Sequence, residues 1–516
     1  MNIDRTQELA RQAIQKMDAG DFQGALDLAY KIRSLRSDYH VSYIVSGLLI
    51  DIGFGLGNEE TVKEGAELLK RDFEEIVNHE ELAPIAYYNR ANGLYALFRL
   101  KMIKNPNSVY FQGTELDQAR IYYRKALDYD IQDADLASRI WVNLGNCFDT
   151  LGRVVDALEC YEKSLEWKSD LGMALGNKGI ALRYYALVSG EHQATYLIEA
   201  YSLLSQALKL GVVPEALNTF SEYLEDIKKW FPDKKTLDKP PKYPGYTIEA
   251  ESEFERFLVE FCLKNKLFLN ICNFCQRCNV AIGDTAVIKK MIVHSRGIEE
   301  NSLRGSHCLR LSAYLNQIKQ DYVAARFLLV LSRYKGLNLS FVNRHVTIIN
   351  TLDYSLHDIN VQLVKTSFKS FYDILDKIAC FINSYLELGI FEKHVDFRKL
   401  WYSNSKRKKV RKKIDKTKNP SLNALFDIHR GFRKDGPYEK MQKTRNALTH
   451  RFVNIRMLQE FEDEENMTEE TLVKHTLELA RIVRSAIIYL LYFVDFEERK
   501  KEHVLNLAKI RVKNCR

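Results

Sequence analysis

The sequence predicts an all-α protein whose two helical regions are joined by a proline-rich linker. The composition is that of a globular protein tilted toward helix, with 46% hydrophobic residues, 28% charged residues and 9 prolines among 516 residues. Apolar residues recur at three- and four-residue steps along much of the chain, which is the spacing of amphipathic helices. Four of the nine prolines fall within residues 231–246, where no helix can continue.

A chain of 516 residues is too long for one hydrophobic core, so the sequence predicts several domains. We expect a helical repeat domain at 1–230 and the linker at 231–246. A helical connecting region with a cysteine cluster is expected at 247–354, followed by a C-terminal helical domain at 355–516.

The pattern of apolar residues and cysteines bears on the location of the protein. The N-terminus has no apolar signal core, and the longest clean apolar run, Ala486 to Val494, has nine residues where a membrane-spanning helix needs roughly 20. The nine cysteines do not form an evenly spaced disulfide framework, which favours a reducing compartment. We therefore expect a cytoplasmic protein with no membrane partner.

The first region contains an internal repeat. Its clearest copy consists of Trp141, Leu144, Gly145, Phe148, Gly152, Ala157, Tyr161 and Leu165. A second copy begins 34 residues later, with Leu175, Gly179 and Leu182 at matching positions. This spacing resembles the tetratricopeptide repeat (TPR), a pair of helices that approach closely where the facing residues are small. The resemblance implies a TPR-like helical array with a concave surface for an unknown protein or peptide partner, and a packing scaffold is the alternative.

The second half shows helical periodicity without repeats. Two long amphipathic helices are predicted at 363–388 and at 468–496. Between them lie a run of basic residues at 406–418 and a short helical segment at 440–455. This pattern predicts a helical bundle with a charged, looped insertion.

The short helical segment contains a chemically distinctive group of residues. Arg445 is followed directly by the polar Asn446, and His450 lies five positions after the arginine. This arrangement resembles the R-x4-6-H motif of the HEPN superfamily, and the resemblance covers at least residues 355–500. It implies an HEPN-type helical bundle with ribonuclease activity and with Arg445, Asn446 and His450 as catalytic residues. A spacing within the same range also occurs at Arg33 and His40, where no such bundle is expected.

These residue types fit RNA cleavage without a metal, in which the 2′-hydroxyl attacks the adjacent phosphate. A histidine that titrates near neutral pH can take up or deliver the proton, so His450 is the candidate general acid or base. The planar guanidinium of Arg445 can bind two phosphate oxygens and stabilise the pentavalent transition state. Asn446 is expected to position the arginine or the sugar.

Helix geometry constrains how the motif can work. Residues five apart on a regular helix point about 140° apart around its axis. Either the helix begins or distorts within the motif, or two chains share one cleft. The HEPN resemblance favours a composite cleft, and two-fold pairing is the commonest oligomer, so we predict a homodimer. We expect Asp376 and Lys377 to form a surface ion pair, with a further polar contact to this cleft as the alternative.

Two further clusters have open interpretations. The basic run at 406–418 holds nine of the 76 Lys and Arg residues and one aspartate, and outside it the two signs of charge are equal in number. It is either a contact for RNA or a solvated loop. Cys272, Cys275 and Cys278 have metal-ligand spacing. Because a structural zinc site usually has two separated ligand pairs, we predict no metal and no cofactor, with zinc as the alternative.

Together these features predict a metal-independent endoribonuclease that binds RNA, with tRNA as one candidate substrate, under the control of the array. The resemblance implies a toxin or an antiviral defence effector. A ribonuclease without control would damage its own cell, so a control element is required, and the array is the candidate. The main alternative is a non-catalytic protein whose array binds a partner and whose bundle dimerises or holds RNA. An enzyme acting on an RNA end or a nucleotide is a third hypothesis.

Overall fold

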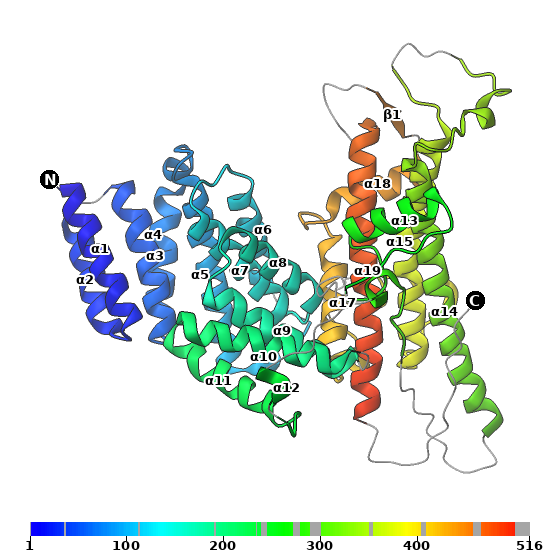
Figure 1. Ribbon diagram of the computed structural model, residues 1–516. Coiled ribbons are helices and arrows are strands. Elements are labelled where there is room, and N and C mark those ends of the chain that lie inside the picture. The colour runs from blue at the N-terminus through cyan, green and yellow to red at the C-terminus, as the bar shows by residue number, and fades with distance from the viewer. Residues whose placement is uncertain are drawn as a thin grey trace. The chain divides into compact units, whose positions relative to one another are not determined.

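The computed structural model divides into two compact units, Met1–Pro241 and Lys242–Arg516 (Figure 1). The residues it describes are 2–35, 38–111, 114–189, 192–233, 235–238, 245–271, 279–288, 301–349, 354–403, 409–451, 453–457 and 466–500. Each unit is built almost entirely from helices, which confirms the predicted all-α fold class. Among these residues, no helix combines the length and the hydrophobicity that crossing a membrane requires.

The first unit consists of helices that pack in consecutive pairs. Its described helices are α1 (Asn2–Asp18), α2 (Phe22–Leu35), α3 (Tyr39–Gly55), α4 (Glu59–Val77), α5 (Ala83–Lys104), η1 (Pro106–Val109), α6 (Thr114–Leu127), α7 (Ala134–Thr150), α8 (Val154–Trp167), α9 (Gly172–Ser189), α10 (Gln193–Leu210), α11 (Pro214–Lys228) and α12 (Lys235–Asp238). Helix α1 packs on α2, α3 on α4, α5 on α6, α7 on α8 and α9 on α10, and each pair contacts the next. This is the stacking expected of a TPR-like array.

Glycines set the turns and the close approach within these pairs. Gly20, Gly57 and Gly152 each follow the first helix of a pair, with φ of 81°, 66° and 80°, a region that favours glycine. In the pair of α7 and α8, a Cβ added to Gly145 would lie 2.6 Å from the ring of Tyr161. The repeat positions recognised in the sequence are therefore places where the helices approach closely.

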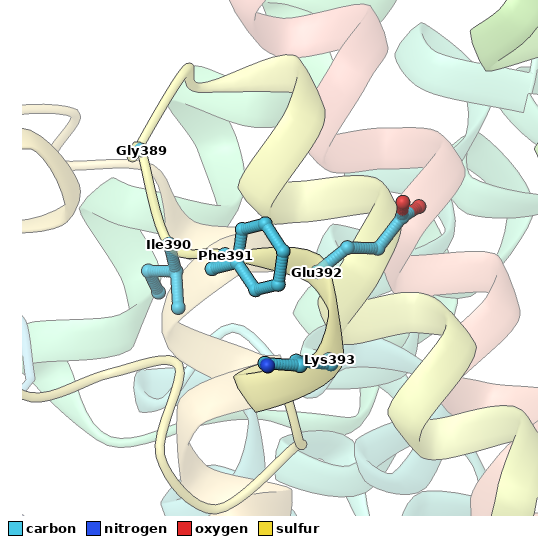
Figure 2. Close-up of a pocket in the computed structure, with 5 residues that line it drawn as sticks. All are labelled: Gly389, Ile390, Phe391, Glu392 and Lys393. Atoms are coloured by element: carbon cyan, nitrogen blue, oxygen red, sulfur yellow. The ribbon is translucent and has the colours of Figure 1, made fainter.

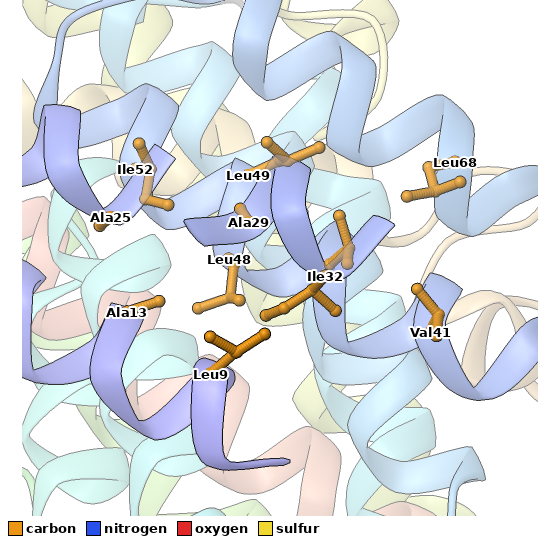
Figure 3. Packing of buried hydrophobic residues seen from close by; sticks show 11 residues of the cluster. Leu9, Ala13, Ala25, Ala29, Ile32, Val41, Leu48, Leu49, Ile52 and Leu68 are labelled. Atoms are coloured by element: carbon orange, nitrogen blue, oxygen red, sulfur yellow. The ribbon is translucent and has the colours of Figure 1, made fainter. Parts of the chain in front are cut away.

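Aliphatic side chains fill the space between the first two pairs (Figure 3). Leu9 and Ala13 of α1 belong to one buried cluster with Ala29 and Ile32 of α2 and with Leu48 of α3. The alanines let neighbouring helices approach, and the larger side chains fill the gaps between them. No single helix of the array could bury this apolar surface alone, so the pairs stabilise each other.

The second unit is a bundle around three long helices, α14 (Asn301–Arg333), α15 (Ile359–Tyr385) and α19 (Glu469–Arg499). Its shorter described elements are α13 (Glu253–Lys264), η3 (Asn279–Ile282), η5 (Ser340–Asn343), η6 (Glu392–His394), α16 (Lys412–Asp415), α17 (Pro420–Gly431), α18 (Glu439–His450), β1 (Asn454–Arg456) and β2 (Asn466–Thr468). Helix α15 packs against α14, α18 and α19, and α17 packs against α19. The helices predicted at 363–388 and 468–496 correspond to α15 and α19.

The predicted C-terminal end of the short helix at 440–455 is wrong. Helix α18 stops at His450, and residues 454–456 form β1, which pairs in parallel with β2. Val453 and Ile455 are buried and lie two residues apart, as side chains on one face of a strand do. The strand depends on partners distant in sequence, because β2 follows later and Ser355 forms an antiparallel bridge with Arg456.

A buried helix also lies in the segment predicted as a charged loop. The side chain of Asn419 caps α17 by accepting from the N–H groups of Ser421 at 3.0 Å and Leu422 at 3.1 Å. Pro420 occupies the first turn of α17, where its missing N–H costs nothing. The pair Asn419 and Pro420 was the local signal for this helix.

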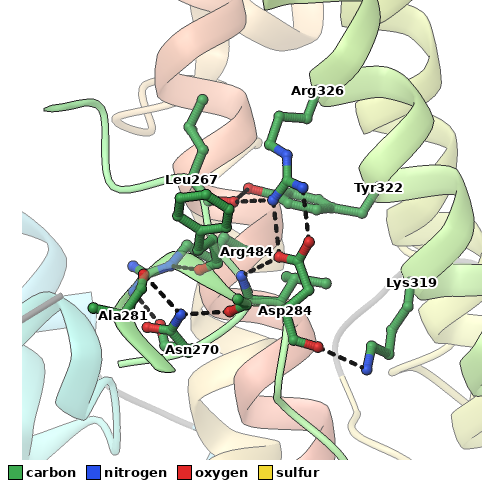
Figure 4. A network of polar contacts seen from close by, with 11 residues as sticks. Leu267, Asn270, Ala281, Asp284, Lys319, Tyr322, Arg326 and Arg484 are labelled. Atoms are coloured by element: carbon green, nitrogen blue, oxygen red, sulfur yellow. Dashed lines mark hydrogen bonds and ion pairs between the residues drawn. The ribbon is translucent and has the colours of Figure 1, made fainter. Parts of the chain in front are cut away.

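Polar contacts fix the stretches at 267–271 and 279–286 to the bundle (Figure 4). Arg326 of α14 forms a two-pronged ion pair with Asp284, at 2.8 and 2.7 Å, and donates to the carbonyl of Leu267 at 3.1 Å. The fully buried Arg484 of α19 donates from Nε to the carbonyl of Phe268 at 2.8 Å. These two arginines anchor irregular backbone that is distant from them in the sequence.

Candidate functional site

Helix α18 carries all three residues of the Arg445 motif. Its buried face includes Met441, Thr444 and Ala447. Arg445 is half-buried and Asn446 is exposed. His450 is the last residue of α18, and its side chain lies outside the described part of the structure.

The helix is continuous through the motif, from Glu439 to His450, so it does not begin within it. At 3.6 residues per turn, Arg445 and His450 leave α18 about 140° apart and about 7.5 Å apart along its axis. The next residue, Arg451, is extended, with φ of −133° and ψ of 175°. The backbone positions of Arg445 and His450 therefore lie on different sides of α18.

Arg445 is laid over an aromatic ring of the neighbouring helix α15. Its Cζ lies 5.3 Å from the centroid of the Tyr372 ring, within the range of a cation–π contact. The Tyr372 ring is only 5% exposed and meets Phe432 edge-on at 5.5 Å. The ring below the arginine is therefore held by buried neighbours, whereas Arg445 itself is half-buried.

A chain of hydrogen bonds connects the same tyrosine to Asn446. The Tyr372 hydroxyl donates to Oε1 of Gln442, and Nε2 of Gln442 donates to Oδ1 of Asn446 at 3.0 Å. Gln442 is 8% exposed, and burial raises the pKa of Tyr372 to about 12, so the hydroxyl keeps its proton at neutral pH. Sequence reasoning missed both residues. The available signal was a glutamine on the buried face of α18, three positions before Arg445.

Two carboxylates of α15 act on Arg445 electrostatically. Burial raises the pKa of Asp373 and that of Asp376, and the positive charge of Arg445 opposes the rise in both. Asp376 also accepts from the backbone N–H of Phe397 at 2.8 Å. Lys377, which we had considered together with Asp376, instead pairs with Asp321 of α14.

A second histidine lies near the motif on α19. Nδ1 of His475 is 3.5 Å from Oγ1 of Thr444, the residue directly before Arg445. The Thr444 hydroxyl also donates to the carbonyl of Lys440 at 3.0 Å. No local pattern singled out His475, because it lies 31 positions from Thr444.

Part of the basic run stabilises the fold. Lys413 donates to the carbonyl of Glu387, just beyond the end of α15, and Arg411 donates from Nε to the carbonyl of Leu400 at 2.8 Å. Lys412 and Lys416 are exposed. Residues 404–408 lie outside the described residues, and contact between the run and RNA stays a prediction.

Among the described residues, no other candidate from the sequence joins the motif. Cys272, Cys275 and Cys278 lie outside the described residues, within which no group of three or more His, Cys, Asp and Glu residues is arranged to hold a metal. An open pocket after α15 is lined by Gly389, Ile390, Phe391, Glu392 and Lys393 (Figure 2). None of the three motif residues lines that pocket.

Comparisons with known proteins agree with both predicted resemblances. Residues 304–497 match the family model described as LA2681-like HEPN, and residues 138–171 match a tetratricopeptide repeat. The HEPN match begins within the segment that we expected to connect the domains and includes α15, α18 and α19. A search of curated proteins finds no match.

Solved structures also match the chain. One is the TPR2AB-domain:pHSP90 complex of yeast Sti1, which is 12% identical, covers 44% of this chain and 99% of its own, and has a TM-score of 0.18. The assignment of the array therefore depends on its own helix packing and on the repeat at 138–171.

Proposed function

We propose that the protein is a metal-independent endoribonuclease whose catalytic residues are Arg445, Asn446 and His450. The observation that carries the proposal is the fixed placement of the Arg445 guanidinium over Tyr372, beside Asn446, within the residues that match the HEPN family. Arginine and the asparagine amide both offer hydrogen-bond donors, and phosphate oxygens only accept. A pair of hydrogen-bond donors of this kind is suited to binding the phosphate of a phosphodiester.

The reaction needs no group beyond the chain and the RNA. A base removes the proton of the 2′-hydroxyl, and the oxygen attacks the adjacent phosphorus, which places extra negative charge on the phosphate oxygens. Arg445 stabilises that charge, and an acid protonates the departing 5′-oxygen. The products are a 2′,3′-cyclic phosphate and a 5′-hydroxyl, and His450 serves as the acid or the base.

We propose that two chains share the cleft. The backbone positions of Arg445 and His450 lie about 140° apart around α18, which supports this arrangement, because a second copy can supply the residue that lies on the other side of one helix. A mixture of Arg445→Ala and His450→Ala chains tests it. Partial recovery of cleavage on mixing supports a shared site, and two inactive chains that stay inactive after proven exchange contradict it.

We propose that the array binds a protein or peptide partner and thereby controls the cleft in the cytoplasm, as in a toxin or a defence effector. Side-chain amides support the binding role. Asn143 of α7 donates to Oδ1 of Asn92 of α5 at 3.0 Å, and Asn177 of α9 donates to Oδ1 of Asn146 of α7 at 2.8 Å. Linked amides on the first helices of successive pairs offer donors and acceptors of the kind that a peptide backbone needs.

The test of cleavage combines purified protein with total RNA and defined tRNAs in the presence of a chelator. Arg445→Ala and His450→Ala should leave the RNA intact, while His40→Ala, at the similar spacing in the first unit, should cut like wild type. Equal cleavage by all four proteins would remove the motif from the mechanism. Intact RNA in every reaction, with activating partners supplied, would favour the non-catalytic TPR/HEPN binding module instead.

A further inference from the structure

We propose that Tyr372 and Gln442 are positioning residues. They orient Arg445 and Asn446 so that both side chains present hydrogen-bond donors to one phosphate. This inference rests on the proposed function for its substrate. Neither residue belongs to the R-x4-6-H motif, and they come from two helices, α15 and α18, whose contact brings together residues 70 positions apart.

The first step is the platform under the arginine. The Tyr372 ring is buried, is held edge-on by Phe432 and carries the Arg445 guanidinium at 5.3 Å. Stacking fixes the plane of a guanidinium while leaving its N–H groups free to bond at the edge. The aromatic ring therefore orients the fork of donors without using any of them.

Two carboxylates on α15 compete with the Tyr372 ring for the guanidinium of Arg445. Asp373 adjoins Tyr372 in the chain, Asp376 lies one turn further along α15, and both attract the charge of Arg445. An arginine engaged in a two-pronged ion pair with a carboxylate would lose donors that a phosphate needs. Stacking on the tyrosine keeps the guanidinium available next to these carboxylates.

The second step is the direction of the hydrogen-bond chain. The tyrosine hydroxyl donates to the carbonyl oxygen of Gln442, which leaves the Gln442 amide to donate to Oδ1 of Asn446. With its oxygen engaged at 3.0 Å, the exposed Asn446 turns its NH₂ group outward. The two hydrogen bonds thus select which end of the asparagine a substrate meets.

Gln442→Glu tests that direction with almost no change of shape. A carboxylate accepts from Tyr372 but cannot donate to Asn446, so the asparagine must turn its NH₂ group inward and show oxygen to the phosphate. We expect kcat/KM for RNA to fall about 100-fold at neutral pH, as for loss of one oriented donor. Once protonated, the introduced carboxyl group can donate again, so the ratio of variant to wild-type kcat/KM should recover as the pH falls from about 8 to about 5.

Tyr372 is tested by a graded pair of substitutions and a matched control. Tyr372→Phe keeps the ring and removes the hydroxyl, so it should cost about tenfold in kcat, the effect of one hydrogen bond. Tyr372→Leu removes the ring as well and should also weaken binding of a 2′-deoxy oligonucleotide, which cannot be cleaved. The control is Tyr385→Phe on the same helix. Tyr385 lies about 20 Å further along the helix axis than Tyr372, and its hydroxyl donates to Glu498.

Thermal unfolding checks that each variant is folded. If Tyr372→Leu does not fold, the isosteric Gln442→Glu still tests the proposal. If wild type cuts RNA and folded Gln442→Glu cuts equally fast at every pH, the positioning role is overturned. If wild type does not cut RNA but Gln442→Glu and Tyr372→Leu still weaken oligonucleotide binding, the positioning role stands and the ribonuclease proposal fails. Equal losses in Tyr385→Phe would show a general packing effect and would also overturn it.

Discussion

Replacing Arg445 with lysine separates the charge at the candidate site from the shape of the group that carries it. Lysine keeps the positive charge, but its ammonium is compact and cannot grip two phosphate oxygens in one plane. It also loses the stacked position at 5.3 Å over Tyr372. The variant therefore removes geometry and leaves most of the electrostatic attraction.

The size of the effect follows from the two lost contacts. A cation–π contact at a partly exposed site contributes about 0.5–1 kcal/mol. One of two charge-assisted hydrogen bonds to a phosphate contributes about 1.5–3 kcal/mol. A loss of roughly 2–4 kcal/mol in the transition state lowers kcat/KM roughly 30- to 1000-fold.

The assay is cleavage of a fluorescent oligoribonucleotide in the presence of a chelator, with kcat and KM determined separately for wild type, Arg445→Lys and Arg445→Ala. Arg445→Lys should fall between the other two. If it retains more than about a third of the wild-type kcat/KM while Arg445→Ala is inactive, the charge alone suffices and the reasoning from the stacked, planar guanidinium is refuted.

Three further predictions concern other parts of the chain. Gly145→Ala should destabilise the array by roughly 1–3 kcal/mol in urea unfolding, because its Cβ would lie 2.6 Å from the Tyr161 ring. Gly93→Ala, whose Cβ would meet Ile50 at 3.3 Å, is the control and should be close to neutral. Asp149 lies at the surface, but neighbouring protein atoms displace water from its carboxylate and raise its pKa to about 6, against the charge of Arg99. A folded-state pKa above the unfolded value of 3.8 means that stability falls as the pH rises from about 4 to about 7, so Asp149→Asn should flatten that decline in unfolding experiments. Neutralising the exposed Lys412 and Lys416 should lower RNA affinity and reduce the salt slope by about 0.7 per lysine, whereas Lys413→Gln should mainly lower thermal stability because Lys413 binds the carbonyl of Glu387. Unchanged RNA affinity and slope after the first change would show that Lys412 and Lys416 are only solvated.

Features set by local periodicity and by side-chain size were predictable from the sequence. The pairing of helices follows from small residues such as Gly145 at repeat positions, and the family matches agree with the HEPN and tetratricopeptide resemblances. Helix α18 ends at His450, and the strand β1 that follows pairs with residues distant in sequence, which no local pattern contains.

The surroundings of the motif could not be predicted, because they depend on which helix packs against α18. Arg445 and Asn446 were found from their spacing, whereas Tyr372 became relevant only once α15 lay beside them. Gln442 occupies the buried face of α18, where a polar residue needs partners that only the tertiary structure supplies. The catalytic roles of Arg445, Asn446 and His450 stay predictions.

The central claim is that this protein cuts RNA by attack of the 2′-hydroxyl, and a single-atom change in the substrate tests it most directly. One cleaved nucleotide of a defined oligoribonucleotide is replaced by its 2′-deoxy form, and the products are mapped in the presence of a chelator. Cleavage should disappear at that position alone, while the other positions still yield 2′,3′-cyclic phosphate ends. Continued cleavage at the deoxy position, or products with 5′-phosphate ends, would contradict the claim.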